Sequence, residues 1–222
     1  TMTKVIPQQF PLPFRVDIEA TFESYWSEAD QLIVAQLKML AGGMGDHSPA
    51  AQSDSHHWVY LAAEHGRGIS HLLQASCALA IANGQQALYL NLAELLKAYA
   101  DSPQGVFDGF ESYTLLCLDD IDCLEGQLDW QEQLFYLLER LKAKGKSRLL
   151  LGSHRVAKQL DFSLADLKSR LSLASGFQLA ALTDQQKLQL LQFKSRRLGL
   201  VINEECSQFL LQRFSRDLQD LM

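Results

Sequence analysis

The stretch WVYLAAEHGRGISHLLQASCALAIANG, residues 58–84, decides the fold. Residues 58–63 form an apolar run that predicts a buried strand, whereas residues 68–83 have the character of a helix that stops at an Asn-Gly pair. A turn containing Gly66 and Gly68 joins the two. A strand that leads through a glycine turn into a helix is the first half of a parallel crossover unit, which predicts an α/β fold.

Strands and helices continue to alternate after this unit. The segment TLLCLDD at 114–120 is a continuous apolar run that ends in acid, as expected for a strand covered on both faces. Such alternation is the signature of parallel strands joined by helical crossovers. Further strands are expected at 86–91, 148–153 and 177–182, with a short helix after the first of them and a longer helix at 128–144.

The two ends of the chain differ from this central part. Proline residues without a helical or strand period predict an extended tail at the start. A helix is expected to begin with Asp30 as its N-cap and to end at Gly42-Gly43. From Thr183 the pattern is purely helical, and TDQQ resembles a capping box. The predicted organisation is a tail over 1–17, an α/β domain over 18–182 and a small all-α lid over 183–222 that is expected to be incomplete.

Composition narrows the class of protein. With 222 residues and 47% hydrophobic content, the chain can bury a core. A formal net charge of −6 argues against duplex DNA as the main partner, because non-specific affinity for DNA comes largely from Lys and Arg. The sequence has no apolar run of membrane-spanning length and no secretory signal, so a cytoplasmic protein is expected. The cysteines fit no metal-ligand spacing and are expected to be reduced and buried, at Cys77, Cys117, Cys123 and Cys206.

The turn after the first strand has part of a phosphate-binding pattern. In the full P-loop, GxxxxGK(S/T), glycines let backbone N–H groups approach phosphate, a Lys contacts the β- and γ-phosphates and a hydroxyl binds magnesium. Here Ala63 stands at the first glycine position, and Gly66 and Gly68 keep the tight turn. Ile69 replaces the Lys, whereas Ser70 keeps the hydroxyl. A helix N-terminus can hold a diphosphate without the Lys, although the glycines alone also fit an ordinary turn.

Two adjacent carboxylates, Asp119 and Asp120, end the strand at 114–120. Open α/β sheets place ligands at the carboxyl ends of their strands. In P-loop enzymes such an acid helps to hold magnesium and its neighbour orients the attacking water. A solvated acidic turn is the alternative, but the two halves on consecutive crossover units favour a nucleotide site. Ser70, Asp119 and Asp120 would then be the ligands of any bound magnesium ion.

Both segments resemble the bacterial replication initiator DnaA, which belongs to the AAA+ superfamily. AEHGRGISHLL at 63–73 is similar to the DnaA loop GGTGLGKTHLL, and LLCLDDID at 115–122 is similar to the DnaA strand LLIDDIQ. The resemblance covers roughly 18–222 and implies an AAA+ P-loop sheet with flanking helices that binds ADP or another nucleoside diphosphate. The loop residues implied to contact the nucleotide are Glu64, His65, Gly66, Arg67, Gly68, Ile69, Ser70 and His71, and whether Arg67 compensates for the missing Lys stays open.

Two further segments resemble functional segments of DnaA. RLLLGSHR, which contains Ser153 and His154, is similar to the sensor-1 strand, but DnaA usually has Asp in place of His154, so the role of that residue stays open. DLKSRL at 166–171 resembles the box that supplies an arginine finger, which implies that role for Arg170. Because a finger acts across an interface, Arg170 is expected to be exposed. On spacing alone, Arg170 also fits an ordinary solvated helix residue.

Two weaker matches concern the nucleotide's phosphates and base. FSRDLQ at 214–219 resembles the sensor-2 segment VRELEG, which implies that Arg216 lies over the phosphates, with a salt bridge inside the lid as the alternative. Phe22 and Tyr25 resemble the DnaA segment beside the base. Aromatic residues at this spacing also fit a core.

The tail segment QFPLPF at 9–14 resembles the segment by which Hda-type members of the DnaA-related family bind the sliding clamp. A peptide stiffened by proline loses little entropy when it docks. The resemblance implies that Leu12 and Phe14 enter an apolar groove while Gln9 forms hydrogen bonds. A tail that folds onto its own domain is the alternative.

Together these resemblances imply a negative regulator of replication initiation. Bound to a nucleoside diphosphate and tethered to the clamp, it would stimulate ATP hydrolysis by DnaA through Arg170, and Ile69 predicts that it is not itself an efficient ATPase. The alternatives are an autonomous ATPase of the helicase-loader type, which would use Asp119 and Asp120, and a clamp adaptor with a vestigial nucleotide site. The implied partners are DnaA and the DNA polymerase III sliding clamp. A homodimer is compatible with the sequence, whereas membrane contact and strong direct DNA binding are not expected.

Overall fold

A computed structural model describes most of the chain. The described residues are 20–43 except 26 and 28, 57–197 except 101 and 146, and then 199–203, 205–207 and 209. The residues of the predicted clamp-binding tail and the sensor-2 arginine lie outside the described residues, namely Gln9, Leu12, Phe14 and Arg216. Within the described part of the chain, no helix combines the length and the apolar character that crossing a membrane requires.

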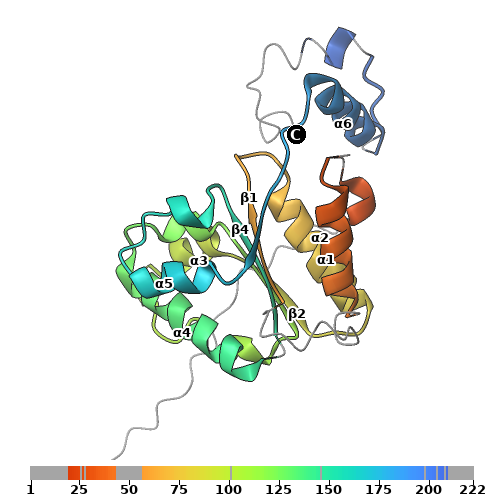
Figure 1. Ribbon diagram of the computed structural model, residues 1–222. Coiled ribbons are helices and arrows are strands. Elements are labelled where there is room, and N and C mark those ends of the chain that lie inside the picture. Colours follow the sequence, from red (N-terminus) through yellow and green to blue (C-terminus); the bar gives the residue numbers. More distant parts are fainter. Residues whose placement is uncertain are drawn as a thin grey trace, which may run out of the picture.

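The centre of the fold is an all-parallel sheet of five strands in the order β2-β3-β4-β1-β5 (Figure 1). Strands β1, β3 and β4 are buried along their whole length, as expected for strands covered on both faces. The predicted α/β sheet is therefore confirmed. The strands are β1 (Trp58–Ala62), β2 (Ala87–Asn91), β3 (Leu115–Asp119), β4 (Arg148–Ser153) and β5 (Ser175–Gln178).

The last strand ends earlier than predicted. Strand β5 pairs with β1 only as far as Gln178. Two residues later, Ala180 donates its backbone N–H to the carboxylate of Asp30. The prediction of a strand over 177–182 was wrong in its limits, because the pairing ends where β1 ends, at Ala62.

Helices cover both faces of the sheet (Figure 1). On one face α1 and α2 pack with Val59 and Leu61 of β1, and on the other α3, α4 and α5 pack with Trp58 and Tyr60. Successive residues of a strand point to opposite faces, so β1 contributes to both cores. The helices are α1 (Gln31–Gly42), α2 (Ile69–Ala82), α3 (Leu92–Ala98), α4 (Leu128–Lys144) and α5 (Ala165–Leu171), with the short 3-10 turns η1 (Phe22–Ser24), η4 (Phe110–Ser112), η5 (Ile121–Leu124) and η6 (Ala157–Gln159).

A helix outside these layers, α6 (Asp184–Arg197), begins the predicted lid. The Thr183 hydroxyl accepts a hydrogen bond from the N–H of Gln186 at 3.2 Å, and the Gln186 side-chain oxygen accepts from the N–H of Thr183 at 2.9 Å. These two bonds confirm the capping box that the sequence predicted. Figure 1 shows α6 beyond the edge of the sheet where β1 ends and α2 begins.

Asp30 precedes α1, but its side chain does not cap the helix. Its carboxylate accepts the Tyr25 hydroxyl at 2.8 Å and the Ala180 N–H at 3.0 Å, and the residue is 2% exposed. The predicted side-chain cap was wrong because two donors from other segments hold the carboxylate in the interior. The helix does end at Gly42, and Gly43 follows with a left-handed backbone (φ 79°).

The cysteines are free thiols, but not all of them are buried. Cys77 and Cys117 lie in the core, Cys123 is half-buried and Cys206 is exposed. The expectation of burial was wrong for Cys206. This residue lies in a short helical turn outside the sheet layers, where its backbone N–H donates to the Asn203 side chain.

Candidate functional site

The loop between β1 and α2 contains two glycines in a conformation that other residues rarely adopt. Gly66 and Gly68 have φ values of 73° and 88°. A side chain on Gly68 would also collide with Tyr25, because a ring carbon lies 2.8 Å from where a Cβ would stand. Gly68 directly precedes α2, so the free N–H groups of the helix face the loop. The loop therefore has the geometry of an anion-binding turn.

Ile69, at the position of the P-loop Lys, packs into the core. It is 6% exposed, and its Cγ2 atom lies 2.5 Å from where a Cβ on Gly152 of β4 would stand. The Oδ1 atom of Asp119 lies 2.6 Å from the same place. Ile69 therefore fills the space between α2 and the sheet, beside an acid of β3, and brings no positive charge to the loop.

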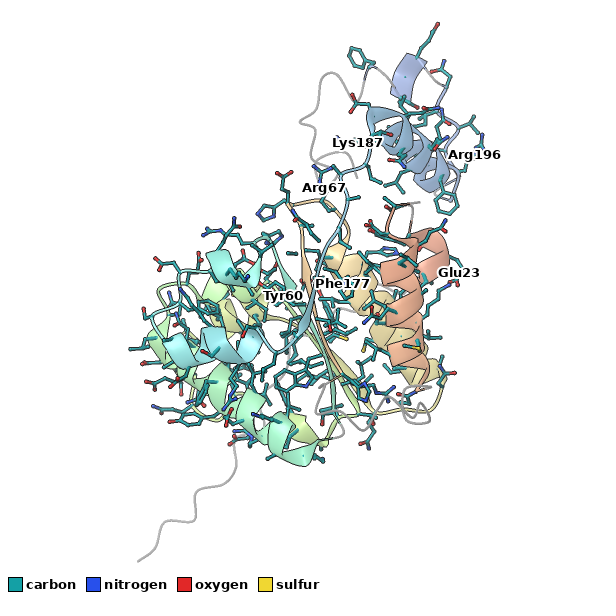
Figure 2. The ribbon with its side chains drawn as sticks, viewed as in Figure 1. Glu23, Tyr60, Arg67, Phe177, Lys187 and Arg196 are labelled. Atoms are coloured by element: carbon teal, nitrogen blue, oxygen red, sulfur yellow. The ribbon has the colours of Figure 1, made fainter. Side chains whose placement is uncertain are left out.

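Arg67 is held by its own loop. Its Nη2 atom donates to the Glu64 carboxylate at 2.9 Å, and the Arg67 side chain is 18% exposed whereas that of Glu64 is 83% exposed. Figure 2 shows Arg67 at the edge of the sheet nearest to α6. Glu64 thus neutralises the cation that lies closest in sequence to the missing Lys.

His71, in the first turn of α2, faces η1. Its Nε2 atom donates to the carbonyl oxygen of Thr21 at 2.7 Å and lies 3.3 Å from the Ser24 hydroxyl. Its ring centre lies 5.9 Å from that of Tyr25. These contacts fasten η1 to α2 and engage the Nε2 edge of His71.

The two predicted base-binding aromatics differ in their surroundings. Tyr25 packs on Gly68 and donates its hydroxyl to Asp30, and burial raises the pKa of Tyr25 above its usual range. Phe22 is 7% exposed and belongs to the core between α1 and α2, with the Lys38 ammonium 5.4 Å from its ring centre. In the contacts described, Tyr25 packs against the loop and Phe22 packs in the core, so a contact of either ring with a nucleotide base stays a prediction.

Asp119 and Asp120 follow one another at the end of β3, and both carboxylates have protein partners. Asp119 is 1% exposed and accepts the Tyr89 hydroxyl at 2.9 Å and the Asp120 N–H at 3.0 Å. Burial raises the pKa of Asp119, and a hydrogen bond from Ser70 partly opposes that rise. Asp120 has a left-handed backbone (φ 57°) and accepts Asn91 Nδ2 at 2.7 Å. The acids are therefore tied to the neighbouring strand and helix.

Asp122 belongs to the same cluster and was missed from the sequence. Its Oδ1 atom accepts the Ser153 hydroxyl at 3.0 Å and the N–H of His154 at 2.9 Å. The Nδ1 atom of His154 lies 3.3 Å from Asp122 Oδ2 and 3.6 Å from Asp120 Oδ1. The third acid in the run Asp-Asp-Ile-Asp was the signal that could have identified it.

These contacts shift two pKa values in opposite directions. Burial would raise the pKa of Asp122, but the hydrogen bonds from His154 outweigh burial and hold it well below its usual range. The hydrogen bond to Asp122 raises the pKa of His154, and the charges of Asp122 and Asp120 add to the rise although burial opposes it. The neighbouring acids therefore stabilise the cationic form of His154 relative to its neutral form.

His65 of the loop stacks on His154. The ring centres are 3.5 Å apart and the ring planes are inclined by 22°. Since β1 and β4 are neighbours in the sheet, the loop after β1 and the residue after β4 reach the same edge. The stack thus joins the phosphate-type loop to the acidic cluster.

The predicted magnesium ligands also reach this edge. Ser70 hydrogen-bonds to Asp119, while Asp120 is held by Asn91 and His154. In the described part of the chain, no group of three or more His, Cys, Asp or Glu side chains is arranged to hold a metal ion. Magnesium binding therefore stays a prediction.

Arg170 lies on α5, apart from the loop and the acids. Its Nε atom forms an ion pair with Glu139 of α4, and its side chain is 29% exposed. The expectation of an exposed Arg170 was wrong to that extent, because Glu139 from the neighbouring helix covers part of the guanidinium. The pair uses the Nε edge of Arg170.

Two family models match consecutive parts of the chain. The model described as the bacterial DnaA ATPase domain matches residues 40–179, which is more than half of the chain. The model described as the lid domain of Hda matches residues 184–222.

Solved structures share this fold at low sequence identity. Domain III of the replication initiation protein DnaA from Thermotoga maritima is 19% identical, with a TM-score of 0.74 over 94% of this chain and 86% of that one. AMPPCP-bound DnaA from Aquifex aeolicus is 20% identical, with a TM-score of 0.71 over 93% of this chain and 63% of that one. A RuvB variant from Thermotoga maritima is 15% identical, with a TM-score of 0.61 over 91% of this chain and 61% of that one. This chain thus spans less than two thirds of the Aquifex DnaA chain.

Proposed function

Because this chain belongs to the DnaA-related AAA+ family and carries an Hda-type lid, we propose that it is a regulator that binds a nucleoside diphosphate and stimulates ATP hydrolysis by DnaA. In this proposal hydrolysis takes place in the nucleotide site of DnaA. The observation that carries it is a phosphate-type loop whose glycine geometry is intact while Ile69, at the Lys position, is buried in the core.

Nucleotide binding is supported by the loop and its surroundings. Gly66 and Gly68 allow the backbone to turn so that the N-terminal N–H groups of α2 point at a bound phosphate. Tyr25 packs on the loop and would border the rest of the nucleotide. The Aquifex DnaA structure, which has the same fold, contains the nucleotide analogue AMPPCP. We infer that this chain holds a nucleoside diphosphate, with ADP as the expected ligand.

Slow hydrolysis is supported by the occupied acids and the missing cation. A P-loop ATPase needs a Lys at the β- and γ-phosphates and acids that are open to magnesium and water. Here Ile69 supplies no charge, Asp119 is 1% exposed and Asp120 is engaged by Asn91. These observations weigh against an autonomous ATPase of the helicase-loader type.

Arg170 is the proposed finger for the ATP that DnaA holds. An arginine finger stabilises the charge that develops in phosphoryl transfer and is worth a factor of about 10³ to 10⁵ in rate. Arg170 forms an ion pair with Glu139 through Nε, and its side chain is 29% exposed. The exposed part of the guanidinium would be presented to a partner's phosphate.

The proposed tether is the tail, which lies outside the described residues. Gln9, Leu12 and Phe14 would attach the protein to the DNA polymerase III sliding clamp and so bring it to replicating DNA. Self-association into a homodimer is compatible with this arrangement. A clamp adaptor with a vestigial nucleotide site is the rival function, and extraction of nucleotide from the purified protein separates the two.

The test is ATP hydrolysis by DnaA, measured with and without this protein and with DNA-loaded clamp. Stimulation that requires all three components is the expected result. If DnaA hydrolyses ATP at the same rate in every combination, the regulatory function is refuted. A rate of ATP turnover by the isolated protein that matches an active AAA+ ATPase would favour the autonomous enzyme instead.

A further inference from the structure

We propose that the stacked rings of His65 and His154 exclude the terminal phosphate of a nucleoside triphosphate and so make the site selective for diphosphates. This inference rests on the proposed function, since it assumes that the loop binds a nucleotide. It assigns a role to the histidine whose place DnaA usually gives to an acid. Selectivity would then have a steric cause in addition to the missing Lys.

The order of the strands puts the stack in the path of the third phosphate. The loop follows β1, His154 follows β4, and the acids follow β3. Since β4 lies between β1 and β3, a phosphate chain that runs from the loop toward Asp119 and Asp120 crosses the end of β4. His65 and His154 meet at that point with their ring centres 3.5 Å apart.

The contacts of His154 also occupy the acids that a triphosphate would need. Its Nδ1 atom lies 3.3 Å from Asp122 and 3.6 Å from Asp120. Its backbone N–H donates to Asp122 as well, so both the main chain and the ring of His154 are held by this acid. A terminal phosphate with its metal ion would have to displace this imidazole before it reached Asp120.

A diphosphate meets no such obstacle. Gly68 leads directly into α2, and the free N–H groups at the start of that helix can bind phosphate without contact with the acids. In this proposal the first two phosphates stay with the loop, and the third would meet the rings.

Replacement of His65 is the cleanest test of the proposed phosphate exclusion. His65 is exposed, so its removal should not destabilise the fold. Nucleotide-free wild type and His65→Ala would be titrated with ADP and with a non-hydrolysable ATP analogue by isothermal calorimetry. The expected result is a ratio of triphosphate to diphosphate affinity that rises by about tenfold or more in His65→Ala, while ADP affinity stays within about twofold. His154→Ala should raise the same ratio.

Two further variants serve as matched controls. His65→Phe keeps a ring in the stack and should keep the wild-type ratio. His57→Ala removes a histidine at the opposite end of β1 and should also leave the ratio unchanged.

The outcomes separate this inference from the function on which it rests. The inference is overturned if wild type binds ADP and the ratio of triphosphate to diphosphate affinity is unchanged in both His65→Ala and His154→Ala. The stacked rings would then not exclude the third phosphate. Equal weakening of both ligands would also overturn it, because it would show that the rings only support the loop. If neither wild type nor any variant binds either nucleotide, the nucleotide site itself is refuted.

Discussion

A methyl group added to Gly152 should destabilise the protein because it would crowd three neighbouring side chains. The Cβ of alanine at this position would stand 2.5 Å from Ile69 Cγ2, 2.6 Å from Asp119 Oδ1 and 2.8 Å from Leu73 Cδ1. Ile69 is held by its helix and Asp119 by the Asp120 N–H, so neither can move away cheaply. Overpacking of this kind costs about 1–3 kcal/mol, which for a chain of this size lowers Tm by roughly 2–12 °C.

The double variant Gly152→Ala with Ile69→Ala isolates the contact with Ile69, which is the shortest of the three. Ile69→Ala alone should cost about 2–5 kcal/mol, but it also removes Cγ2 and makes room for the new methyl. The double variant should therefore be more stable than the sum of the single changes predicts by about 1 kcal/mol or more, as measured by urea unfolding. Gly176→Ala on β5 is the control, because its Cβ would meet nothing within 4 Å. Additivity within about 0.5 kcal/mol would refute the packing argument.

Three other perturbations test the site and the proposed partners. Arg170→Ala should change stability by less than about 1 kcal/mol, since its ion pair is partly exposed, yet it should abolish stimulation of DnaA; if clamp binding and stimulation both survive, the finger role is refuted. Leu12→Ala with Phe14→Ala should abolish clamp binding and leave Tm unchanged, whereas a lower Tm with clamp binding intact would mean that the tail packs on its own domain. The pair of His154 and Asp122 should stabilise the fold at pH values between the lowered pKa of Asp122 and the raised pKa of His154. Below that window Asp122 is protonated and above it His154 is neutral, so His154→Ala should lower Tm more at pH 6 than at pH 9, and an equal loss at both would contradict the ion pair.

The sheet and its order of elements could be predicted because local patterns decide them. Buried parallel strands are continuous apolar runs, and the helix at 128–144 has the limits that the sequence predicted. The end of β5 could not be predicted from its own residues. It depends on where β1 stops and on the donor that Ala180 offers to Asp30, which lies far away in the sequence.

The candidate site also has features that the sequence could predict and features that it could not. The glycine turn and the two acids follow from spacing, because a strand fixes the edge at which its last residues lie. The partners of those acids do not follow from spacing, since Tyr89 and Asn91 come from β2 and His154 follows β4. The stack of His65 on His154 joins two loops whose meeting depends on the strand order, and no local pattern indicated it.

The carboxylate of Asp30 connects two distant segments of the chain. One of its oxygens holds Tyr25, whose ring rests on Gly68, and the other holds the backbone of Ala180, a few residues before α6. A ligand that pushes Tyr25 away from the loop would pull on Asp30 and, through it, on the strand-to-helix connection. A movement of Tyr25 would therefore reach the segment before α6 through one buried side chain.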